Sequence, residues 1–308
     1  MKGTSVAIDL EAVILAVSDD VPRIITLDRG GRPALPSGPL DPGRDRTLEL
    51  GLRRWVLEQT GLEVGYVEQL YTFGDQFRDP SEQTGGARLL SIAYLALVRE
   101  EQPSVGAVWQ AVYSFLPWED RRSGPHEGLS EQIAPAVEQW LAGDGASREE
   151  RARIALARDG TPWDPVRVLD RYELLYELGL VPEKYRDRNE REPQDDLVAA
   201  QSMAADHRRV LATALGRVRG KLTYRPVVFE LLPERFTLGQ LQGVVEALSG
   251  VRFHKQNFRR LVDRAGLVEG IGELDAHTGG RPAELYRFRR EVVVERPRPG
   301  VGLPGLRS

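Results

Sequence analysis

The sequence predicts an α/β domain and an α+β domain joined by a helical segment. Residues 1–145 contain five apolar or alternating segments typical of strands and two amphipathic helices. Residues 146–218 carry helical patterns and no strand, whereas residues 219–292 carry two helices followed by two short strands. We therefore expect a first domain at 1–145, a helical linker or dimerisation segment at 146–218, a second domain at 219–292, and a disordered tail at 293–308.

The first domain is expected to be a mixed-sheet sandwich. Its predicted strands lie at 5–17, 22–27, 67–73, 88–98 and 108–116. The most apolar of them, 88–98, is expected to lie in the middle of the sheet, where both faces are covered. Helices are predicted at 47–60 and 129–141, the second with Pro135 inside it, which either kinks the helix or delays its start.

The middle segment is predicted to be wholly helical. Helices are expected at 147–158, 165–180 and 197–218, with an exposed, charged linker at 187–196. No catalytic pattern occurs in this segment, which would join the two domains or mediate dimerisation.

The last third has the order helix, turn, helix, hairpin. A short strand or turn at 224–233 precedes a helix that Thr237 caps and Ser249-Gly250 ends, and a second helix covers 253–265. Strands at 267–271 and 285–288 flank a turn. This order predicts a winged helix-turn-helix.

Composition places the chain among ordinary water-soluble proteins. Of its 308 residues, 41% are hydrophobic and 29% charged. Cysteine is absent, which excludes disulfides and thiolate metal sites, and the four histidines show no ligand spacing. The longest apolar run, 92–98, is far shorter than the roughly 20 residues of a membrane helix. Because the N-terminus also lacks a signal-peptide pattern, we expect a cytoplasmic protein without a membrane partner.

Charge divides the chain into an acidic front and a basic back. Residues 206–290 contain 16 Lys/Arg and 9 Asp/Glu, a net of +7, whereas residues 1–205 carry a net of −12. This asymmetry favours separate partners for the two halves, with nucleic acid as the candidate for the basic half. A solvated basic surface is the alternative that charge alone leaves open.

The stretch 35–62, a Gly/Pro-rich loop followed by an amphipathic helix, resembles a Nudix box. That motif is a glycine, five residues, Glu, seven residues, then Arg-Glu-apolar-x-Glu-Glu-x-Gly-apolar, and its carboxylates hold Mg²⁺ beside a diphosphate. Aligned on Gly61, the four acidic positions hold Arg46, Trp55, Glu58 and Gln59.

One carboxylate of four is therefore kept, and the loop from 38 to 46 is two residues longer than the motif. The sequence predicts a helix that binds a nucleotide without cleaving it, with no metal and no catalytic residue. One alternative is an ordinary amphipathic helix. Another is an active hydrolase in which Glu49 or Asp41 assists Glu58, although Glu49 lies about 900° round the helix from Glu58 and points to the opposite side.

The second helix of the predicted winged domain carries the side-chain types that read DNA. Cationic and amide side chains contact phosphates and base edges in the major groove, and a wing adds contacts beside it. The predicted DNA-binding residues are Lys255, Gln256, Asn257, Arg259, Arg260 and Arg281. The alternative is a winged helix that contacts protein only.

Several stretches together resemble the NrtR family of Nudix-related transcriptional regulators. In the first domain these are Leu70-Tyr71-Thr72-Phe73-Gly74-Asp75 and Ser91-Ile92-Ala93-Tyr94. In the second they are Phe229-Glu230-Leu231-Leu232-Pro233, Lys255-Gln256-Asn257-Phe258-Arg259-Arg260 and Gly280-Arg281-Pro282. The helical segment, roughly 147–215, is larger than in the usual family member, so the chain resembles a longer form of the family.

The resemblance implies a Nudix-like sandwich that serves as a sensor and a winged helix that binds an operator in double-stranded DNA. It implies a homodimeric repressor of NAD or pyridine-nucleotide genes that ADP-ribose or a related nucleotide releases from DNA, and it requires no cofactor. The candidate effector-binding residues are Arg44, Arg46, Phe73, Asp75, Arg88 and Tyr94. Each also fits a structural alternative, as a surface cation, core aromatic or turn residue.

Overall fold

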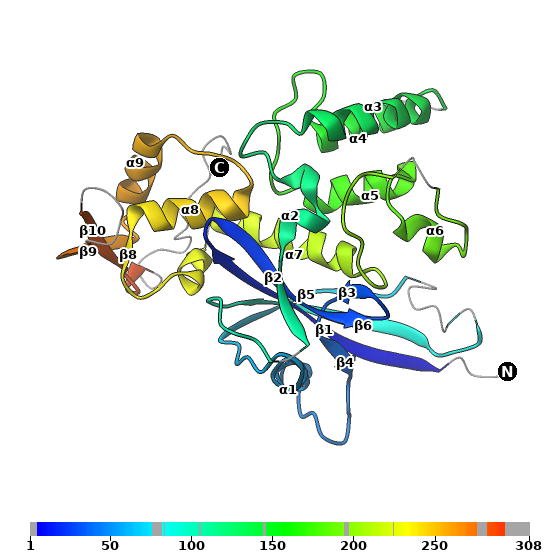
Figure 1. Ribbon diagram of the computed structural model, residues 1–308, viewed down its shortest axis with the longest axis horizontal. Helices are drawn as coiled ribbons and strands as arrows, with labels where there is room; N and C mark the ends of the chain where they lie inside the picture. Colours follow the sequence, from blue (N-terminus) through cyan, green and yellow to red (C-terminus); the bar gives the residue numbers. More distant parts are fainter. Residues whose placement is uncertain are drawn as a thin grey trace.

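The computed structural model places a mixed β-sheet between one helix and a cluster of helices, with a small three-stranded sheet at the C-terminal end (Figure 1). The structure describes residues 5–75, 82, 84–104, 106–143, 146–193, 197–223, 225–275 and 282–292, and for residues 127 and 128 the backbone alone. The predicted tail at 293–308 lies outside these ranges. Within them, no helix is both long and apolar enough to cross a membrane.

The main sheet is built around β1 (Val6–Ser18), whose 13 residues pair with three other strands. β6 (Arg88–Leu97) runs parallel to β1 along ten residue pairs, while β2 (Val21–Arg29) and β4 (Ser37–Pro39) pair with it antiparallel. The order is β3-β2-β1-β6-β5, with β4 on β1 and β7 on β2. The remaining strands are β3 (Arg32–Ala34), β5 (Tyr66–Phe73) and β7 (Ala107–Ala111).

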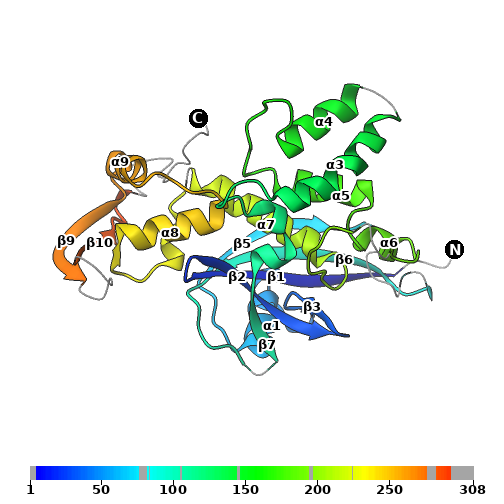
Figure 2. The ribbon, with the colours of Figure 1, turned by 45° about the horizontal axis from the view of Figure 1, so that its top comes forward.

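The two faces of this sheet carry separate cores because β1 and β6 bury alternate residues on opposite sides. On one face, Leu10 and Ile14 of β1 pack with Leu52 and Val56 of helix α1 (Leu48–Thr60). On the other face, Leu15 and its neighbours pack under the helical cluster. Figure 2 shows α1 on one side of the sheet and α7 on the other.

Helix α7 (His207–Leu222) is the centre of the helical cluster. Eleven of its 16 residues are buried, and it contacts β1, β5, β6, α5 and α8. Its buried residues include His207, Arg208 and Arg219 beside the apolar ones, so the elements that cover α7 must also supply polar partners. The helices around it are α2 (Val112–Phe115), the 3₁₀ helix η2 (Pro117–Glu119), α3 (Glu127–Leu141), α4 (Ala146–Leu156), α5 (Val168–Leu178) and α6 (Glu183–Asp187).

The C-terminal part has the predicted order of elements. A 3₁₀ helix η3 (Val227–Leu231) leads into β8 (Phe236–Thr237), α8 (Leu238–Ser249) and α9 (Lys255–Ala265). β9 (Val268–Asp275) and β10 (Ala283–Phe288) form the hairpin, and β8 pairs with β10. Thr237 caps α8 in a reciprocal capping box with Gln240, as Thr-x-x-Gln predicts.

Four sequence predictions need correction. The expected strand 108–116 ends at Ala111, because the apolar run beyond it forms α2 and buries Val112, Tyr113 and Phe115. A short apolar run fits a buried helix as well as a strand. The expected strand or turn at 224–233 contains η3. The helix expected at 129–141 begins earlier, at Glu127, and continues through Pro135.

The helix expected at 197–218 starts ten residues late, at His207. Residues before it follow an irregular path because their backbone N–H groups bond elsewhere. Gln201 N–H donates to Ser114 O at 2.9 Å and Ala204 N–H donates to Pro33 O at 2.8 Å. Sequence periodicity carries no information on such distant partners.

Candidate effector site and nucleic-acid interface

Helix α1 and the loop before it form the Nudix-like element that the sequence predicts. Thr47 caps the helix by accepting a hydrogen bond from Leu50 N, and Gly61 ends it in a left-handed conformation, φ 71°. The loop at 40–47 connects β4 to this cap. The element thus has the loop-helix form that holds metal-binding carboxylates in a Nudix box.

Two of the residues aligned with acidic positions of the Nudix motif, Trp55 and Gln59, hydrogen-bond α1 to β4. Trp55 Nε1 donates to Pro39 O at 2.9 Å, and the Gln59 amide donates to Ser37 O at 2.9 Å and accepts from Ser37 N at 3.0 Å. The indole also covers Gly38, where an added Cβ would fall 2.3 Å from the ring. These side chains therefore have a structural role, because they hold β4 against helix α1.

The one remaining carboxylate, Glu58, is held by cations. Its oxygens lie 3.5 Å from Arg54 and 3.8 Å from Arg44. Arg54 in turn donates two hydrogen bonds to Asp45, at 3.0 and 2.9 Å, and stacks over Trp55. The hydrogen bond from Arg54 holds the pKa of Asp45 below its ordinary value. Among the described residues, no group of three or more acids and histidines is placed to hold a metal ion.

Gly38→Ala is expected to lower the free energy of unfolding by about 1–3 kcal/mol, because the added Cβ would lie 2.3 Å from the indole of Trp55, whose position is fixed by its hydrogen bond to Pro39 O. Urea denaturation of the two proteins measures the difference. Gly65→Ala is the matched control, since an added Cβ there meets nothing within 4 Å. Equal stabilities of the Gly38→Ala variant and the parent would contradict the packing of β4 under Trp55.

The six predicted effector residues do not share one face of the sheet. Arg44 and Arg46 are exposed on the loop after β4, and Tyr94 is buried in the core beneath α1. Phe73 is buried in the core on the α7 side. The structure therefore does not gather the six around one cleft, because strand neighbours alternate between faces.

Two of these residues lie where β5 ends and β6 begins. Asp75 is exposed, with its carboxylate 3.9 Å from Arg209 of α7, and Arg88 donates to Gly74 O at 2.8 Å. Arg88 pairs with Val6 at the start of β1, so this edge adjoins the end of the sheet from which the loop at 40–47 departs. Phe73, Asp75 and Arg88 thus form a second group beside α7.

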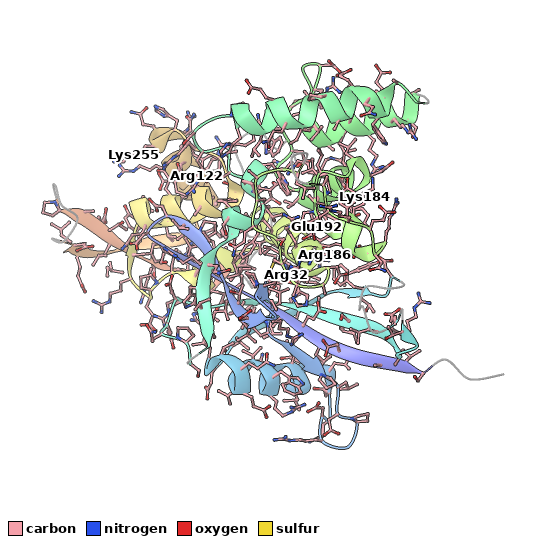
Figure 3. All side chains as sticks on the ribbon, turned by 45° about the vertical axis from the view of Figure 1, so that its right-hand side comes forward. Arg32, Arg122, Lys184, Arg186, Glu192 and Lys255 are labelled. Atoms are coloured by element: carbon pink, nitrogen blue, oxygen red, sulfur yellow. The ribbon has the colours of Figure 1, made fainter. Side chains whose placement is uncertain are left out.

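The nucleic-acid candidates are gathered on one face of α9. Phe258 and Val262 are buried against the rest of the domain, and the opposite face is exposed. The predicted DNA-binding residues Lys255, Gln256, Asn257, Arg259 and Arg260 are all exposed, as are Asp263 and Arg264 near the end of the helix. Arg260 donates to Asn257 Oδ1 at 2.9 Å, which orders this pair on the surface. Figure 3 marks Lys255 at the start of α9, on the periphery of the molecule. The sixth candidate, Arg281, lies outside the described residues.

A buried ionic cluster, Glu119 with Arg171 and Arg219, joins the helical segment to the winged domain. All three side chains are at most 1% exposed. Arg171 donates to both Glu119 oxygens, at 2.5 and 2.8 Å, and Arg219 donates to Glu119 Oε2. Burial alone would raise the pKa of Glu119, but the two guanidiniums outweigh it and hold the pKa below its ordinary value of 4.5.

This cluster holds the C-terminal end of α8. Arg219 Nε donates to Leu248 O at 2.9 Å, Tyr113 OH donates to Ala247 O at 2.5 Å, and Arg121 N–H donates to Gly250 O at 2.8 Å. The free carbonyls of a helix end are thereby satisfied by the neighbouring part of the chain. We call this set of contacts the α8 clamp. Sequence reasoning missed it, because a lone glutamate and scattered arginines look like surface residues.

The winged domain makes a second contact with the rest of the chain at the turn between β1 and β2. Asp19 and Asp20 adopt left-handed conformations there, and Asp20 lies against α8 so closely that a Cβ on Gly243 would fall 2.0 Å from its Oδ1. Arg122 donates to Asp20 O. The winged domain therefore contacts the main sheet as well as the helical segment.

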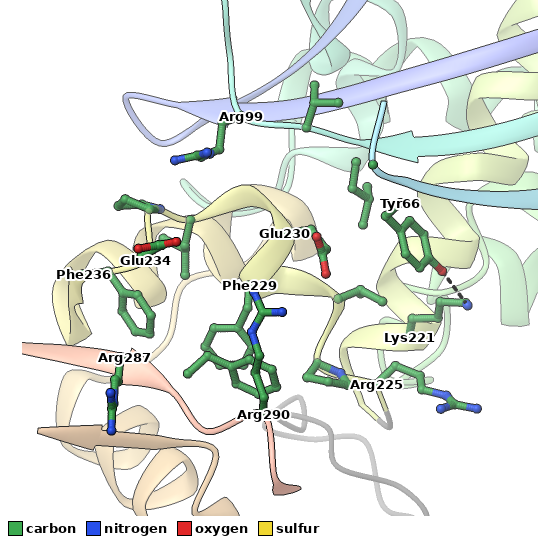
Figure 4. Close-up of a pocket in the computed structure, with 18 of the residues that line it drawn as sticks. Tyr66, Arg99, Lys221, Arg225, Phe229, Glu230, Glu234, Phe236, Arg287 and Arg290 are labelled. Carbon is green, nitrogen blue, oxygen red and sulfur yellow. Dashed lines mark hydrogen bonds between the residues drawn. The ribbon is translucent and has the colours of Figure 1, made fainter. Parts of the chain in front are cut away.

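A cleft of about 950 Å³ separates the edge of the main sheet from the winged domain (Figure 4). Tyr66 and Arg99 line it from the sheet side, and Phe229 and Arg290 line it from the winged side. Acidic side chains lie beside the cations of the cleft. Lys221 forms an ion pair with Glu68 and donates a hydrogen bond to Tyr66 OH at 3.0 Å.

Comparison with known proteins assigns the C-terminal part. The model of the NrtR DNA-binding winged helix domain matches residues 228–288. This part of the chain is therefore similar to the NrtR winged helix domain. The predicted winged helix-turn-helix is thus confirmed, and α9 is the second helix of its helix-turn-helix.

The likeness to NrtR proteins extends over nearly the whole chain. The ADPR responsive transcriptional repressor NtrR of Acinetobacter baylyi is 24% identical over 284 residues, 91% of this chain and 80% of that protein. A solved structure of Shewanella oneidensis NrtR in complex with a 27mer DNA matches with a TM-score of 0.57 at 20% identity, covering 93% of this chain and 95% of that one.

A MutT/nudix family protein from Enterococcus faecalis matches with a TM-score of 0.56 at 16% identity, covering 94% of this chain and 88% of that one. The predicted resemblance to NrtR-type Nudix-related regulators is therefore confirmed, together with the Nudix-like mixed sheet. The Acinetobacter relative is named as a transcriptional repressor, and not as an enzyme.

Proposed function

We propose that the protein is a ligand-responsive transcriptional repressor of NAD or pyridine-nucleotide genes, which binds operator DNA through its NrtR-type domain and is released by ADP-ribose. The observation that carries the proposal is the exposed face of α9, with its three cations and two amides, in a domain that matches a DNA-binding family. The Acinetobacter relative, named as an ADPR responsive repressor and similar over 91% of this chain, supports the effector.

For DNA, we propose that Arg259 and Arg260 pair with guanine edges or phosphates and that Gln256 or Asn257 reads adenine. Lys255 and Arg281 would contact the backbone. A palindromic operator suits a homodimer, which presents two α9 helices one helical turn apart.

For the effector, we propose the end of the main sheet that carries the loop at 40–47, the end of β5 and the start of β6. Arg44 and Arg46 offer exposed cations to a diphosphate, and Arg88 with Asp75 offers a cation and an acceptor at the neighbouring edge. Phe73 and Tyr94 would support these sites from the two cores. No metal or other cofactor is required by this proposal.

The α8 clamp supplies a physical route from effector to DNA. A ligand shifts a conformational equilibrium only by as much as its affinities for the two states differ. Effector contacts near β5 and β6 act on α7, which packs on both strands and carries Arg219 of the clamp. We propose that these contacts change the placement of α8 and, with it, of α9.

The proposed roles of the three segments follow the predicted domain boundaries. Residues 1–145 would sense the effector, residues 146–218 would transmit the signal or dimerise, and residues 219–292 would bind DNA. We do not propose that the protein hydrolyses the effector. Glu58 forms ion pairs with Arg44 and Arg54, and the neighbouring Trp55 and Gln59 hydrogen-bond to the backbone of β4.

ADP-ribose is expected to raise the Tm of the protein with the logarithm of its concentration over Kd, because it binds the folded chain. In the same samples with Mg²⁺, liquid chromatography should show no AMP released from ADP-ribose. AMP is the matched ligand control, since it lacks the diphosphate. A Tm that ADP-ribose leaves unchanged would contradict the proposed effector, and steady AMP release would instead favour a hydrolase.

A further inference from the structure

The helical segment contains a cavity that the proposed function does not use. Its volume is about 230 Å³, and α3, α5, the end of α4 and the loop at 117–126 surround it. Apolar side chains line most of it, from Leu129, Ile133, Ala134, Val137, Leu156 and Leu175. An engineered apolar cavity of about 150 Å³ accepts benzene, so this one has room for a substituted aromatic ring.

Of the three arginines that line this cavity, one forms no ion pair with a described residue. Arg121 lines it, lies with its guanidinium 4.1 Å over the ring of Trp163, and makes no side-chain ion pair with a described residue. The other two arginines at the cavity are paired, Arg158 with Glu138 at 2.5 Å and Arg171 with Glu119. Among the lining side chains that the structure describes, none is acidic.

The electrostatic environment of Arg121 is unfavourable as it stands. Burial, and next to it the positive charge of Arg171, lower the pKa of Arg121. The negative charge of Glu119 acts the other way, but Arg121 is partly removed from water with only a ring face, and no carboxylate, in direct contact. An anion bound at this position would offset the cost of this burial and gain a charge-assisted hydrogen bond.

Two indole N–H groups at the same cavity are also unsatisfied. Trp118 and Trp163 both line it, and in each the Nε1 is buried without a hydrogen-bond partner in the structure. Trp118 is only 7% exposed. Buried donors are paired in most native proteins, and leaving one unpaired costs about 1–3 kcal/mol.

We propose that this cavity is a second ligand site, for a small organic monoanion that has a carboxylate head and an apolar or aromatic body. The carboxylate would pair with Arg121 at the cavity wall. The body would fill the space between Leu129, Ile133 and Val137. The volume suits this class of compound and not a dinucleotide-sized effector, whose sites are typically larger than about 300 Å³.

The site adjoins the α8 clamp. Trp118 precedes Glu119 of the buried cluster, and Arg121 donates its backbone N–H to Gly250 at the end of α8. A ligand here therefore lies beside the contacts that position the winged domain. The binding itself does not depend on the DNA-binding function.

The experiment uses the full chain with four probes, benzoate, phenylacetate and their neutral isosteres benzamide and phenylacetamide. At concentrations about ten times Kd, a carboxylate is expected to raise Tm by about 2–4 °C, and the amides to have a much smaller effect. Isothermal titration calorimetry then gives Kd for the better acid.

Two variants locate the site. Arg121→Gln should weaken carboxylate binding about tenfold or more, whereas Arg153→Gln, on exposed α4 surface away from the lining, should not change it. Ile133→Trp fills the cavity without changing charge, so it should abolish binding while circular dichroism shows the fold retained. Three results would overturn the proposal. The acids and amides could bind equally well, the Arg121→Gln variant could bind the carboxylate as tightly as the parent, or neither acid could bind at millimolar concentration.

Discussion

Replacing Glu119 with glutamine is expected to lower the free energy of unfolding by about 3–5 kcal/mol, the cost of breaking a buried ion pair from one side. The change leaves Arg171 and Arg219 buried, adjacent and without an anion. It also loosens Arg219, which donates to Leu248 O at the end of α8. Urea denaturation measures the loss, and Glu273→Gln, which removes an exposed ion pair with Arg235, is the control at about 0–1 kcal/mol.

The same carboxylate makes stability depend on pH. Because the folded-state pKa of Glu119 lies below its ordinary value of 4.5, its contribution is fully present above that value. It is lost as pH falls from about 4.5 through the lower folded-state pKa. As the pH falls from neutral into that window, the free energy of unfolding should therefore decrease less for the Glu119→Gln variant than for the parent. A variant as stable as the parent at pH 7 would contradict the clamp.

The double variant Arg259→Ala/Arg260→Ala is expected to weaken specific DNA binding by about 2–6 kcal/mol, since one good base contact is worth about 1–3 kcal/mol. The two side chains are exposed on α9, away from buried Phe258 and Val262, so the fold should survive. Fluorescence anisotropy with labelled operator DNA measures the affinity, and circular dichroism checks the fold.

The control is Arg151→Ala, which removes an exposed arginine of the helical segment that pairs with Glu177. Its DNA affinity should match that of the parent. If the double variant instead bound DNA as tightly as the parent, α9 would not be the recognition helix. The parent's affinity should also fall steeply with salt, and the double variant should show a shallower slope, because it releases fewer counterions from phosphates.

The sequence predicted well those elements whose own hydrophobic pattern determines their secondary structure. The alternation in β1 and the apolar run of β6 placed both strands to within one or two residues, and Thr237 and Gly250 marked the ends of α8. Local patterns define such elements because burial on one or both faces leaves a period in the sequence. The exposed face of α9 followed from the same reasoning.

The elements that sequence missed depend on distant partners. β4 exists because it pairs with Asp9 to Glu11 of β1 and because Gln59 and Trp55 bond its backbone. The α8 clamp brings Glu119 together with Arg219 across 100 residues of chain. Neither arrangement leaves a local signal. The effector residues were predicted as one set from resemblance, but strand alternation divides Phe73 and Tyr94 between opposite faces.

The most direct test of the central claim is a titration of a DNA duplex from the region upstream of the gene, followed by anisotropy, with and without saturating ADP-ribose. The account predicts that the full chain binds this duplex and that ADP-ribose weakens the affinity by about 5- to 150-fold, the usual range of allosteric coupling. By linkage, the duplex should weaken ADP-ribose binding by the same factor. An affinity for DNA that ADP-ribose leaves unchanged, in a protein that binds both ligands, would contradict the account.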